Sequence, residues 1–276
     1  MIAFVGSVFS PYYASARRRG PADPEQHCAI NVALYGPDRD RWAMTERGRR
    51  HMSRSADRFS VGPSSVSFED GCYVVRVDEV TVPFPARLKG EIRLRPHVRF
   101  GEHWYLDAAE RHCWQPVAPN AAIEVDFERP DLHWRGSGYL DSNWGSEPLE
   151  AGFVRWHWSR APVESGAIMS YDADRRDGSE LRLGLHYTDA GEVHPIDLPP
   201  LRKAATTGWR VGRAVRSERA ASVRHTAEDT PFYARTMFDV ELAGAPVRMM
   251  HESLDLDRFA SRWVQTLLPF RMPRRR

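Results

Sequence analysis

The segment Glu180-Leu-Arg-Leu-Gly-Leu-His-Tyr187 alternates polar and apolar residues through its three leucines. Successive side chains of a β-strand point to opposite faces of a sheet, so a period of two predicts a half-buried strand. Other segments show the same alternation or come close to it. They are Cys72–Asp78, Glu91–Phe100, Ala122–Glu128 and Val247–Leu254.

Turn-forming residues separate these segments. Examples are Gly36-Pro-Asp38, Glu69-Asp-Gly71, Arg129-Pro-Asp131 and Asp177-Gly-Ser179, and the chain contains 20 prolines and 19 glycines. Many short strands joined by tight turns favour an all-β fold built of sandwiches or barrels. With 276 residues the chain can form two packed halves, and we place the seam near residues 159–166.

Two segments break the strand pattern. Gly48–Phe59 could hold one helix, and Leu256–Leu268 predicts a C-terminal helix packed on a sheet. The helical face expected in the second segment consists of Phe259, Trp263, Val264 and Leu267. The basic run Arg271-Met-Pro-Arg-Arg-Arg276 follows without an apolar partner, which predicts a solvated end or, alternatively, an attraction to anionic lipid headgroups.

Charge and cysteine content exclude several classes of protein. The net charge of +2 gives no overall attraction to nucleic acid, so we expect no nucleic-acid partner. Cys28, Cys72 and Cys113 are widely spaced, which is typical of a reducing compartment rather than of a zinc or redox motif. The apolar stretch at residues 2–8 is too short to span a bilayer, and its basic residues, Arg17–Arg19, follow it in the wrong order for a secretory signal.

An acidic residue lies within a cluster of tryptophans. Four of the nine tryptophans fall between residues 134 and 158, and Asp141 lies among them. These four are Trp134, Trp144, Trp156 and Trp158. On a strand, Tyr139 and Asp141 point to the same face, and His112 and Trp114 have the same spacing upstream. These two pairs of residues form a candidate site.

The same residues also have structural interpretations. Aromatic rings in a β-protein more often form the core than a site, and an aspartate followed by Ser-Asn is typical of a turn. His157, with His103, His112 and His133, follows no metal-binding template, so we expect no metal and a strand position for His157. The chain also lacks the G-x-S-x-G, phosphate-loop and dinucleotide motifs.

Several long motifs resemble the carotenoid 1,2-hydratases of purple photosynthetic bacteria, which are also called hydroxyneurosporene synthases. The similarity is most specific in Gly138-Tyr-Leu-Asp-Ser-Asn-Trp-Gly-Ser-Glu-Pro-Leu-Glu150, and it is looser beyond about residue 160. The other motifs are Ile2–Tyr13, Ala22–Tyr35 and Trp42–Gly48.

The resemblance implies a fold and an activity. The fold would be two lipocalin-like β domains: residues 1–160, with the hydratase motifs, and residues 161–276, a barrel with the terminal helix. The activity would be a cofactor-independent addition of water to the terminal C1=C2 double bond of an acyclic carotene such as neurosporene or lycopene. The family's His-x-Trp and Tyr-x-Asp pairs correspond to His112, Trp114, Tyr139 and Asp141.

The chemistry of alkene hydration suggests a role for each of these residues. An alkene is a very weak base, so Asp141 would have to be protonated, and burial among aromatic rings would raise its pKa. Trp114, Tyr139 and Trp144 could stabilise the resulting cation. His112 could hold the attacking water or form a hydrogen bond with Asp141, and the sequence does not separate these roles. We interpret Trp134, Trp156 and Trp158 as core or as lining around the acid.

The implied substrate also suggests a location. A C40 polyene resides in a bilayer, so we expect a peripheral protein on the cytoplasmic side of the intracytoplasmic membrane. The apolar start, Arg17–Arg19 and the basic C-terminus would contact the membrane surface. Two alternatives stay open at this point: a lipocalin-like carrier of apolar ligands without catalysis, and a related enzyme that acts on another terpenoid or on a polyketide.

Overall fold

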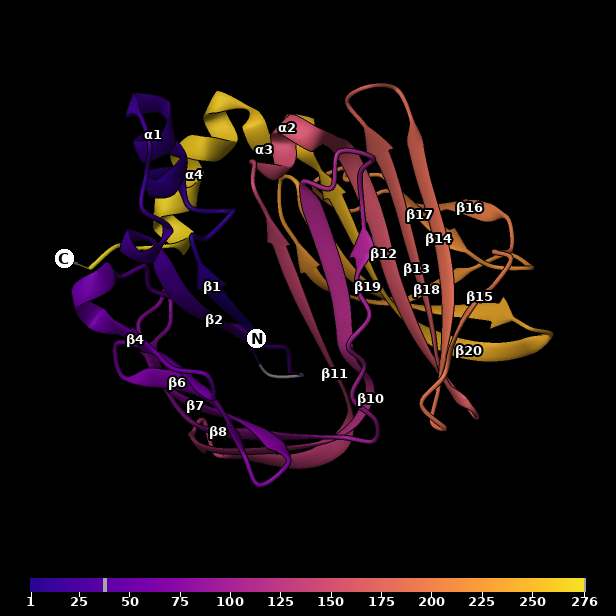
Figure 1. Ribbon diagram of the computed structural model, residues 1–276, viewed down its shortest axis with the longest axis horizontal. Helices are drawn as coiled ribbons and strands as arrows, with labels where there is room; N and C mark the ends of the chain where they lie inside the picture. The colour runs from indigo at the N-terminus through magenta and orange to yellow at the C-terminus, as the bar shows by residue number, and fades with distance from the viewer. Residues whose placement is uncertain (37–38, 276) are drawn as a thin grey trace. The chain divides into compact units, whose positions relative to one another are not determined.

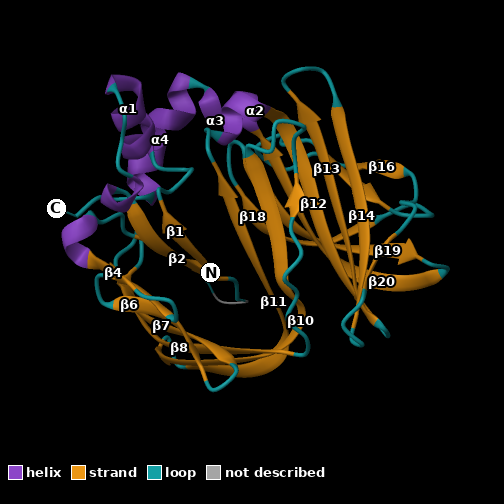
Figure 2. Ribbon diagram, in the orientation of Figure 1, coloured by secondary structure: helices purple, strands orange, loops and turns teal. Residues whose placement is uncertain are grey.

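The computed structural model describes residues 1–36 and 39–275. It confirms the all-β prediction, because antiparallel sheets make up most of the chain and a short helix lies near the C-terminus (Figures 1 and 2). Within these residues, no helix combines the length and the apolar character that a membrane span requires. The last part of the turn predicted at residues 36–38, and Arg276, lie outside the described residues.

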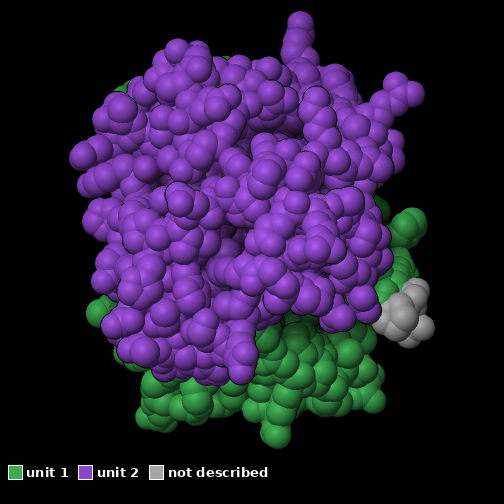
Figure 3. Space-filling view, turned by 90° about the vertical axis from the view of Figure 1, so that its right-hand side faces the viewer, with its two compact units in different colours: residues 1–96, 121–138, 265–276 green, residues 97–120, 139–264 purple. Residues whose placement is uncertain are grey.

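The chain divides into two compact units, each assembled from separate segments (Figure 3). Unit 1 comprises residues 1–96, 121–138 and 265–276, and unit 2 comprises residues 97–120 and 139–264. Strands β10 (His112–Arg129) and β11 (Leu132–Gly145) each contribute to both units. This division differs from the continuous one expected at residue 160, because that residue lies inside strand β12 (Phe153–Val163), which is paired on both sides.

Unit 1 contains a three-stranded sheet and most of an eight-stranded sheet. The small sheet has the order β1-β2-β3, and the large one has the order β11-β10-β8-β7-β6-β5-β4, with β9 (Trp104–Tyr105) also paired to β10. The strands are β1 (Ile2–Val5), β2 (Cys28–Leu34), β3 (Arg41–Met44), β4 (Met52–Arg54), β5 (Arg58–Val61), β6 (Ser64–Glu69), β7 (Cys72–Val80) and β8 (Arg87–Pro96). Alternate residues of β7, among them Val75 and Val77, enter the core with Leu88 and Phe127.

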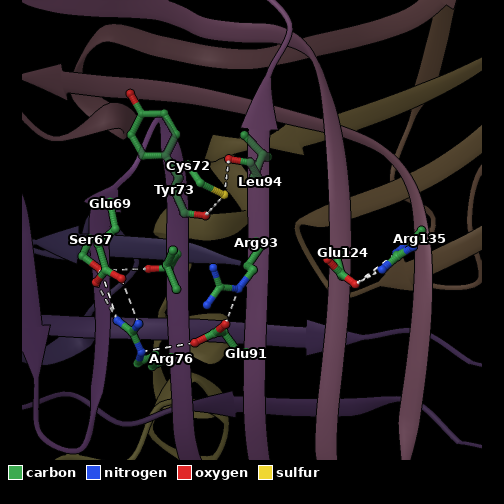
Figure 4. A network of polar contacts seen from close by, with 11 residues as sticks. Ser67, Glu69, Cys72, Tyr73, Arg76, Glu91, Arg93, Leu94, Glu124 and Arg135 are labelled. Atoms are coloured by element: carbon green, nitrogen blue, oxygen red, sulfur yellow. Dashed lines mark hydrogen bonds and ion pairs between the residues drawn. The ribbon is translucent and has the colours of Figure 1, made fainter.

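The opposite face of this sheet carries ion pairs between neighbouring strands (Figure 4). The Arg76 guanidinium bridges Glu69 on β6 and Glu91 on β8, at 2.7 and 3.2 Å. Glu91 also accepts a hydrogen bond from Arg93 at 2.6 Å. The period-two alternation predicted for Cys72–Asp78 therefore separates a buried face from a charged one.

The helix predicted over Gly48–Phe59 is wrong. That segment forms one 3₁₀ turn, Arg49–His51, and then strands β4 and β5. Strand β5 pairs with β6 and buries Val61 completely, so pairing with a neighbouring strand outweighs local helix propensity. The structure instead has a helix that the sequence did not reveal, α1 (Pro11–Arg19), capped by the Ser10 side chain.

Unit 2 is built on a seven-stranded antiparallel sheet with the order β15-β14-β13-β12-β20-β19-β18. Its other strands are β13 (Gly166–Arg175), β14 (Glu180–Thr188), β15 (Val193–Pro195), β18 (Ser222–Asp229), β19 (Tyr233–Leu242) and β20 (Ala245–Asp255), and β16 (Leu201–Ala204) and β17 (Arg213–Arg216) form a separate pair. Its core includes Phe238 and Met249. The strands predicted over 180–187 and 247–254 are confirmed.

The C-terminal helical segment is interrupted at Ser261 into α3 (Leu256–Ala260) and α4 (Arg262–Arg271). Phe259 and Val264 are buried as predicted, but Trp263 and Leu267 are exposed, so the expected face is wrong in part. The break at Ser261 changes the helical phase, and the buried positions in α4 are Val264 and Leu268.

The basic C-terminal run is not a solvated tail. Met272 is buried, the Arg271 guanidinium lies 4.3 Å from the centre of the Trp42 ring, and Arg274 pairs with Glu46. The prediction of a free basic end is therefore wrong for residues 271–274, because these side chains have partners within unit 1.

Candidate active site

Adjacent strands bring three of the four predicted site residues together within unit 2. Trp114 on β10 is buried, and its indole Nε1 donates hydrogen bonds to the Asp141 Oδ2 atom at 3.1 Å and to the Tyr139 hydroxyl at 3.2 Å, both on β11. Trp114 meets both residues because β10 and β11 are neighbours and because Tyr139 and Asp141, two apart on a strand, share a face. Trp114 thus holds the acid and the phenol in one hydrogen-bonded group.

Asp141 is a half-buried carboxyl group with a raised pKa. Burial is the largest cause, since a low-polarity environment disfavours the charged carboxylate. The Asn143 amide, which donates to Oδ2 at 3.0 Å, opposes the shift, and the nearby Glu252 carboxylate reinforces it. Hydrogen bonds with Tyr139 and Trp114 also favour the ionised form, but the net effect is a carboxyl group that keeps its proton to higher pH.

One face of the seven-stranded sheet supplies the surroundings of this acid. Tyr171, Trp158, Glu252 and Arg235 form a row across β13, β12, β20 and β19 by direct strand register. The Trp158 ring lies 5.1 Å from the Tyr139 ring, and the Tyr171 ring lies 5.4 Å from the Trp114 ring. Arg235 neutralises Glu252 with a hydrogen bond of 2.8 Å. The acid is therefore bordered by aromatic rings and by one paired carboxylate.

The two tyrosines of this group are held as neutral phenols. Burial, followed by the nearby Asp141 carboxylate, raises the pKa of both Tyr139 and Tyr171 well above the usual value. The sequence pattern did not reveal Tyr171, because it lies on β13 and only the register with Trp158 brings it to the site.

His112 is buried next to a different carboxylate, Asp107. Its Nδ1 atom lies 2.9 Å from the Asp107 Oδ2 atom. Burial raises the pKa of Asp107, but hydrogen bonds from His112 and from backbone amides outweigh it and hold that pKa below its usual range. An ionised Asp107 can only accept a hydrogen bond, so a neutral imidazole in this position carries its proton on Nδ1 and leaves Nε2 as the acceptor nitrogen. In the part of the chain that the structure describes, this buried Nε2 has no hydrogen-bond partner.

Close packing fixes the orientation of the His112 ring. A Cβ atom added at Gly152 would lie 2.8 Å from its Cε1 atom, and one added at Gly145 would lie 3.2 Å from its Cδ2 atom. The Phe153 ring packs edge-on at 4.8 Å. A side chain at Gly152 or Gly145 would therefore displace the imidazole, so the two glycines leave the space that the ring occupies next to Asp107.

A short helix completes the surroundings of His112. The Glu147 Oε1 atom, just before α2 (Leu149–Gly152), lies 3.9 Å from Nδ1. The Arg111 guanidinium forms ion pairs with the Glu147 carboxylate at 2.9 Å and with the Asp107 carboxylate at 3.8 Å. The sequence pattern did not reveal Asp107, Glu147 and Gly152, and the only local signal was the position of Asp107 five residues before His112.

The four tryptophans of the predicted cluster have different positions. Trp158 is buried against Tyr139, and Trp156 lies 5.9 Å from Tyr171, ring centre to ring centre. Trp144 is 48% exposed and contacts the His103 ring at 5.6 Å. Trp134 is 45% exposed and belongs to unit 1, so the interpretation of this residue as core is wrong.

A surface cavity of about 370 Å³ is lined by none of these residues. It is in unit 1, and its lining includes Trp42 and Phe84. The cavity therefore offers no predicted site residue for the chemistry. Asp141 is the better candidate, because it combines a raised pKa with contacts to aromatic rings.

The antiparallel sheets and the aromatic-bordered acid define a lipocalin-like β-protein with an acid site. The fold is similar to that of a putative AttH protein from Nitrosomonas europaea, with a TM-score of 0.57 and 15% sequence identity over 82% of this chain and 80% of that one. The sequence profile described as "Carotenoid hydratase CrtC" matches residues 1–276. The chain belongs to this carotenoid hydratase family.

Curated relatives agree with this assignment. An acyclic carotenoid 1,2-hydratase from Thiocapsa roseopersicina is 50% identical over 277 residues, which cover 99% of this chain and 68% of the relative. A protein with the same name from Cereibacter sphaeroides is 41% identical, and the match covers 100% of this chain and 98% of the relative. The resemblance of the sequence motifs is thereby confirmed.

Proposed function

We propose that this protein is a carotenoid 1,2-hydratase, a hydro-lyase that adds water to the terminal C1=C2 double bond of acyclic carotenes such as neurosporene and lycopene. Membership of the carotenoid hydratase family supports the reaction class. The observation that carries the mechanism is Asp141, a carboxyl group with a raised pKa among aromatic rings.

In this proposal Asp141 starts the reaction as a general acid. Its O–H bond breaks, the π electrons of the alkene form a new C2–H bond, and C1 becomes a tertiary carbocation. The rings of Trp114, Tyr139 and Trp158 offer electron-rich faces that stabilise positive charge by roughly 0.5–2 kcal/mol each. A neutral phenol at Tyr139 is a weak nucleophile, so it does not trap the cation covalently.

Water completes the addition by forming the C1–O bond. The resulting oxonium must lose a proton, and the Nε2 atom of His112 is the base that we assign to this step. The hydrogen bond between Nδ1 and Asp107 supports this role, because with its proton on Nδ1 the neutral imidazole has Nε2 free to accept, and the Asp107 carboxylate stabilises the imidazolium that forms. The proton taken up by His112 must then return to Asp141 through water to restore both groups, so that the net change is the addition of one water molecule without a cofactor.

The apolar substrate suggests where the protein works. A polyene of this kind dissolves in a bilayer, so we propose a peripheral protein on the cytoplasmic side of the membrane that holds its substrate.

Labelled water tests this function. The purified protein, mixed with lycopene or neurosporene in water enriched with heavy oxygen, should yield a 1-hydroxy carotene with one heavy oxygen atom, as measured by mass spectrometry. Asp126→Asn is the control for the same substitution at Asp141. Asp126 is an exposed aspartate on the same strand as His112. This variant should form the product at the wild-type rate. Binding of carotene without labelled product would instead favour the carrier, and a different labelled product would favour another lipocalin-like enzyme.

A further inference from the structure

Helix α4 carries large apolar side chains on two faces, one buried and one exposed. Val264 and Leu268 are 1% and 6% exposed and form the inner face. Trp263, Leu267 and Phe270 are 46%, 44% and 72% exposed, and their spacing of four and three residues places them on one outer face. Single exposed apolar residues are ordinary, but three on one helical face indicate an interaction surface.

A second exposed tryptophan extends this outer face. Trp209 is 47% exposed, and its ring stacks on the Trp263 ring with centres 6.4 Å apart and planes at 27°. Arg258 on α3 donates a hydrogen bond of 2.7 Å to the Trp209 backbone carbonyl, which holds this loop against the helical segment. Tryptophan rings are enriched where an apolar phase meets water.

The charge of this segment identifies the kind of partner. Helix α4 contains arginines and no acidic residue, and the sequence has no aspartate or glutamate from residue 258 to its end. Arg262 and Arg275 are exposed, whereas Arg271 and Arg274 contact Trp42 and Glu46. Aromatic and aliphatic side chains next to exposed arginines match the headgroup region of an anionic bilayer.

We propose that the outer face of α4, formed by Trp263, Leu267 and Phe270 with the adjacent Trp209, docks this protein onto anionic lipid bilayers. A helix of 10 residues is half the length of a membrane span, so it lies in the plane of the interface with its outer face in the lipid. This inference deepens the proposed function and rests on it, because a hydratase of bilayer-dissolved polyenes has to reach its substrate there. It also replaces the free basic tail as the expected membrane contact.

Vesicle binding tests the surface directly. The full-length protein is sedimented with vesicles of phosphatidylcholine alone and of phosphatidylcholine with phosphatidylglycerol. We expect binding that is stronger with phosphatidylglycerol and weaker at high salt. Phe270→Ser should weaken binding to the mixed vesicles about tenfold, since it removes a large apolar side chain from the lipid. Arg262→Gln should weaken binding to the mixed vesicles only.

The control is Val223→Ser, which removes an apolar side chain of 41% exposure from β18, outside the proposed surface. It should bind the vesicles as tightly as the wild type, and equal binding of the Phe270 and Val223 variants would overturn the proposal. Sedimentation equilibrium without lipid provides the second readout. A wild-type dimer that Phe270→Ser dissociates would show that the face binds a second copy of the chain, and it would also overturn the proposal.

The two proposals can fail separately. A wild-type protein that binds no vesicles, yet hydrates carotene dispersed in detergent, refutes only the docking surface. A protein that binds vesicles, yet forms no labelled hydroxy product, refutes only the proposed function.

Discussion

At the scale of single residues, the site depends on how its two carboxylates differ. Burial dominates at Asp141 and raises its pKa, whereas hydrogen bonds dominate at Asp107 and lower its pKa. One group is thereby suited to give a proton, and the other to remain an anion that orients His112. The sequence predicted the raised pKa of Asp141 from its aromatic neighbours, but it could not reveal Asp107, whose role depends on the folded position of His112.

Asp107→Asn should lower the hydration rate by about 100-fold or more, because an amide can donate to Nδ1 and so favour the tautomer with the proton on Nε2. Nitrogen NMR of labelled histidine reads the protonated ring atom of His112 directly, and we expect the proton to move from Nδ1 to Nε2. A purely structural role of Asp107 would lower the rate without moving this proton. Asp126→Asn, with the same chemical change at an exposed site, should affect neither quantity.

At the scale of elements, strand β12 separates two environments. Trp158 faces the acid together with Tyr171 and Glu252, whereas His157 lies on the other face. There the His157 Nδ1 atom lies 3.1 Å from the Ser253 hydroxyl, and its ring stacks on His251 at 5.5 Å. The sequence predicted a strand position for His157 from the alternation with its tryptophan neighbours, and the structure confirms it.

This buried histidine pair should make the protein sensitive to acid. Burial lowers the pKa of His157 to about 4 and that of His251 well below its usual value. The unfolded chain binds a proton near pH 6.5 and the folded chain does not, so stability present above pH 6.5 is lost as the pH falls toward 4. For His157 the loss is about 3 kcal/mol when complete.

The free energy of unfolding, measured by urea titration between pH 7 and pH 4, checks this prediction. His157→Gln should flatten the dependence on pH even if it lowers stability overall, and His194→Gln, at an exposed histidine, should leave it unchanged. Parallel curves for the wild type and the His157 variant would show that this histidine does not titrate as the structure implies.

The outcomes for helices and strands follow from physical causes. Alternation predicted the long strands because one face of each packs on a core. The segment Gly48–Phe59 was misread because strand pairing overrode helix propensity, and α1 was missed because its nine residues include no buried side chain and hence no apolar stripe.

At the scale of the whole molecule, the chain passes more than once between its two units. Residues 97–120 belong to unit 2, residues 121–138 return to unit 1, and β11 then re-enters unit 2. A sequence read from end to end suggests continuous domains, since nothing local marks such a return. The four predicted site residues nevertheless belong to one unit, because the returning part of β11 carries Tyr139 and Asp141 back beside Trp114.

The central claim is that Asp141 donates the proton that starts hydration. The most direct test compares the rate of labelled hydroxy-carotene formation by the wild type and by Asp141→Asn, with carotene binding measured alongside. The amide is close in shape to the carboxyl group but cannot act as the acid, so we expect the rate to fall by about 100-fold or more while binding is retained. A variant that hydrates carotene at the wild-type rate would contradict the account.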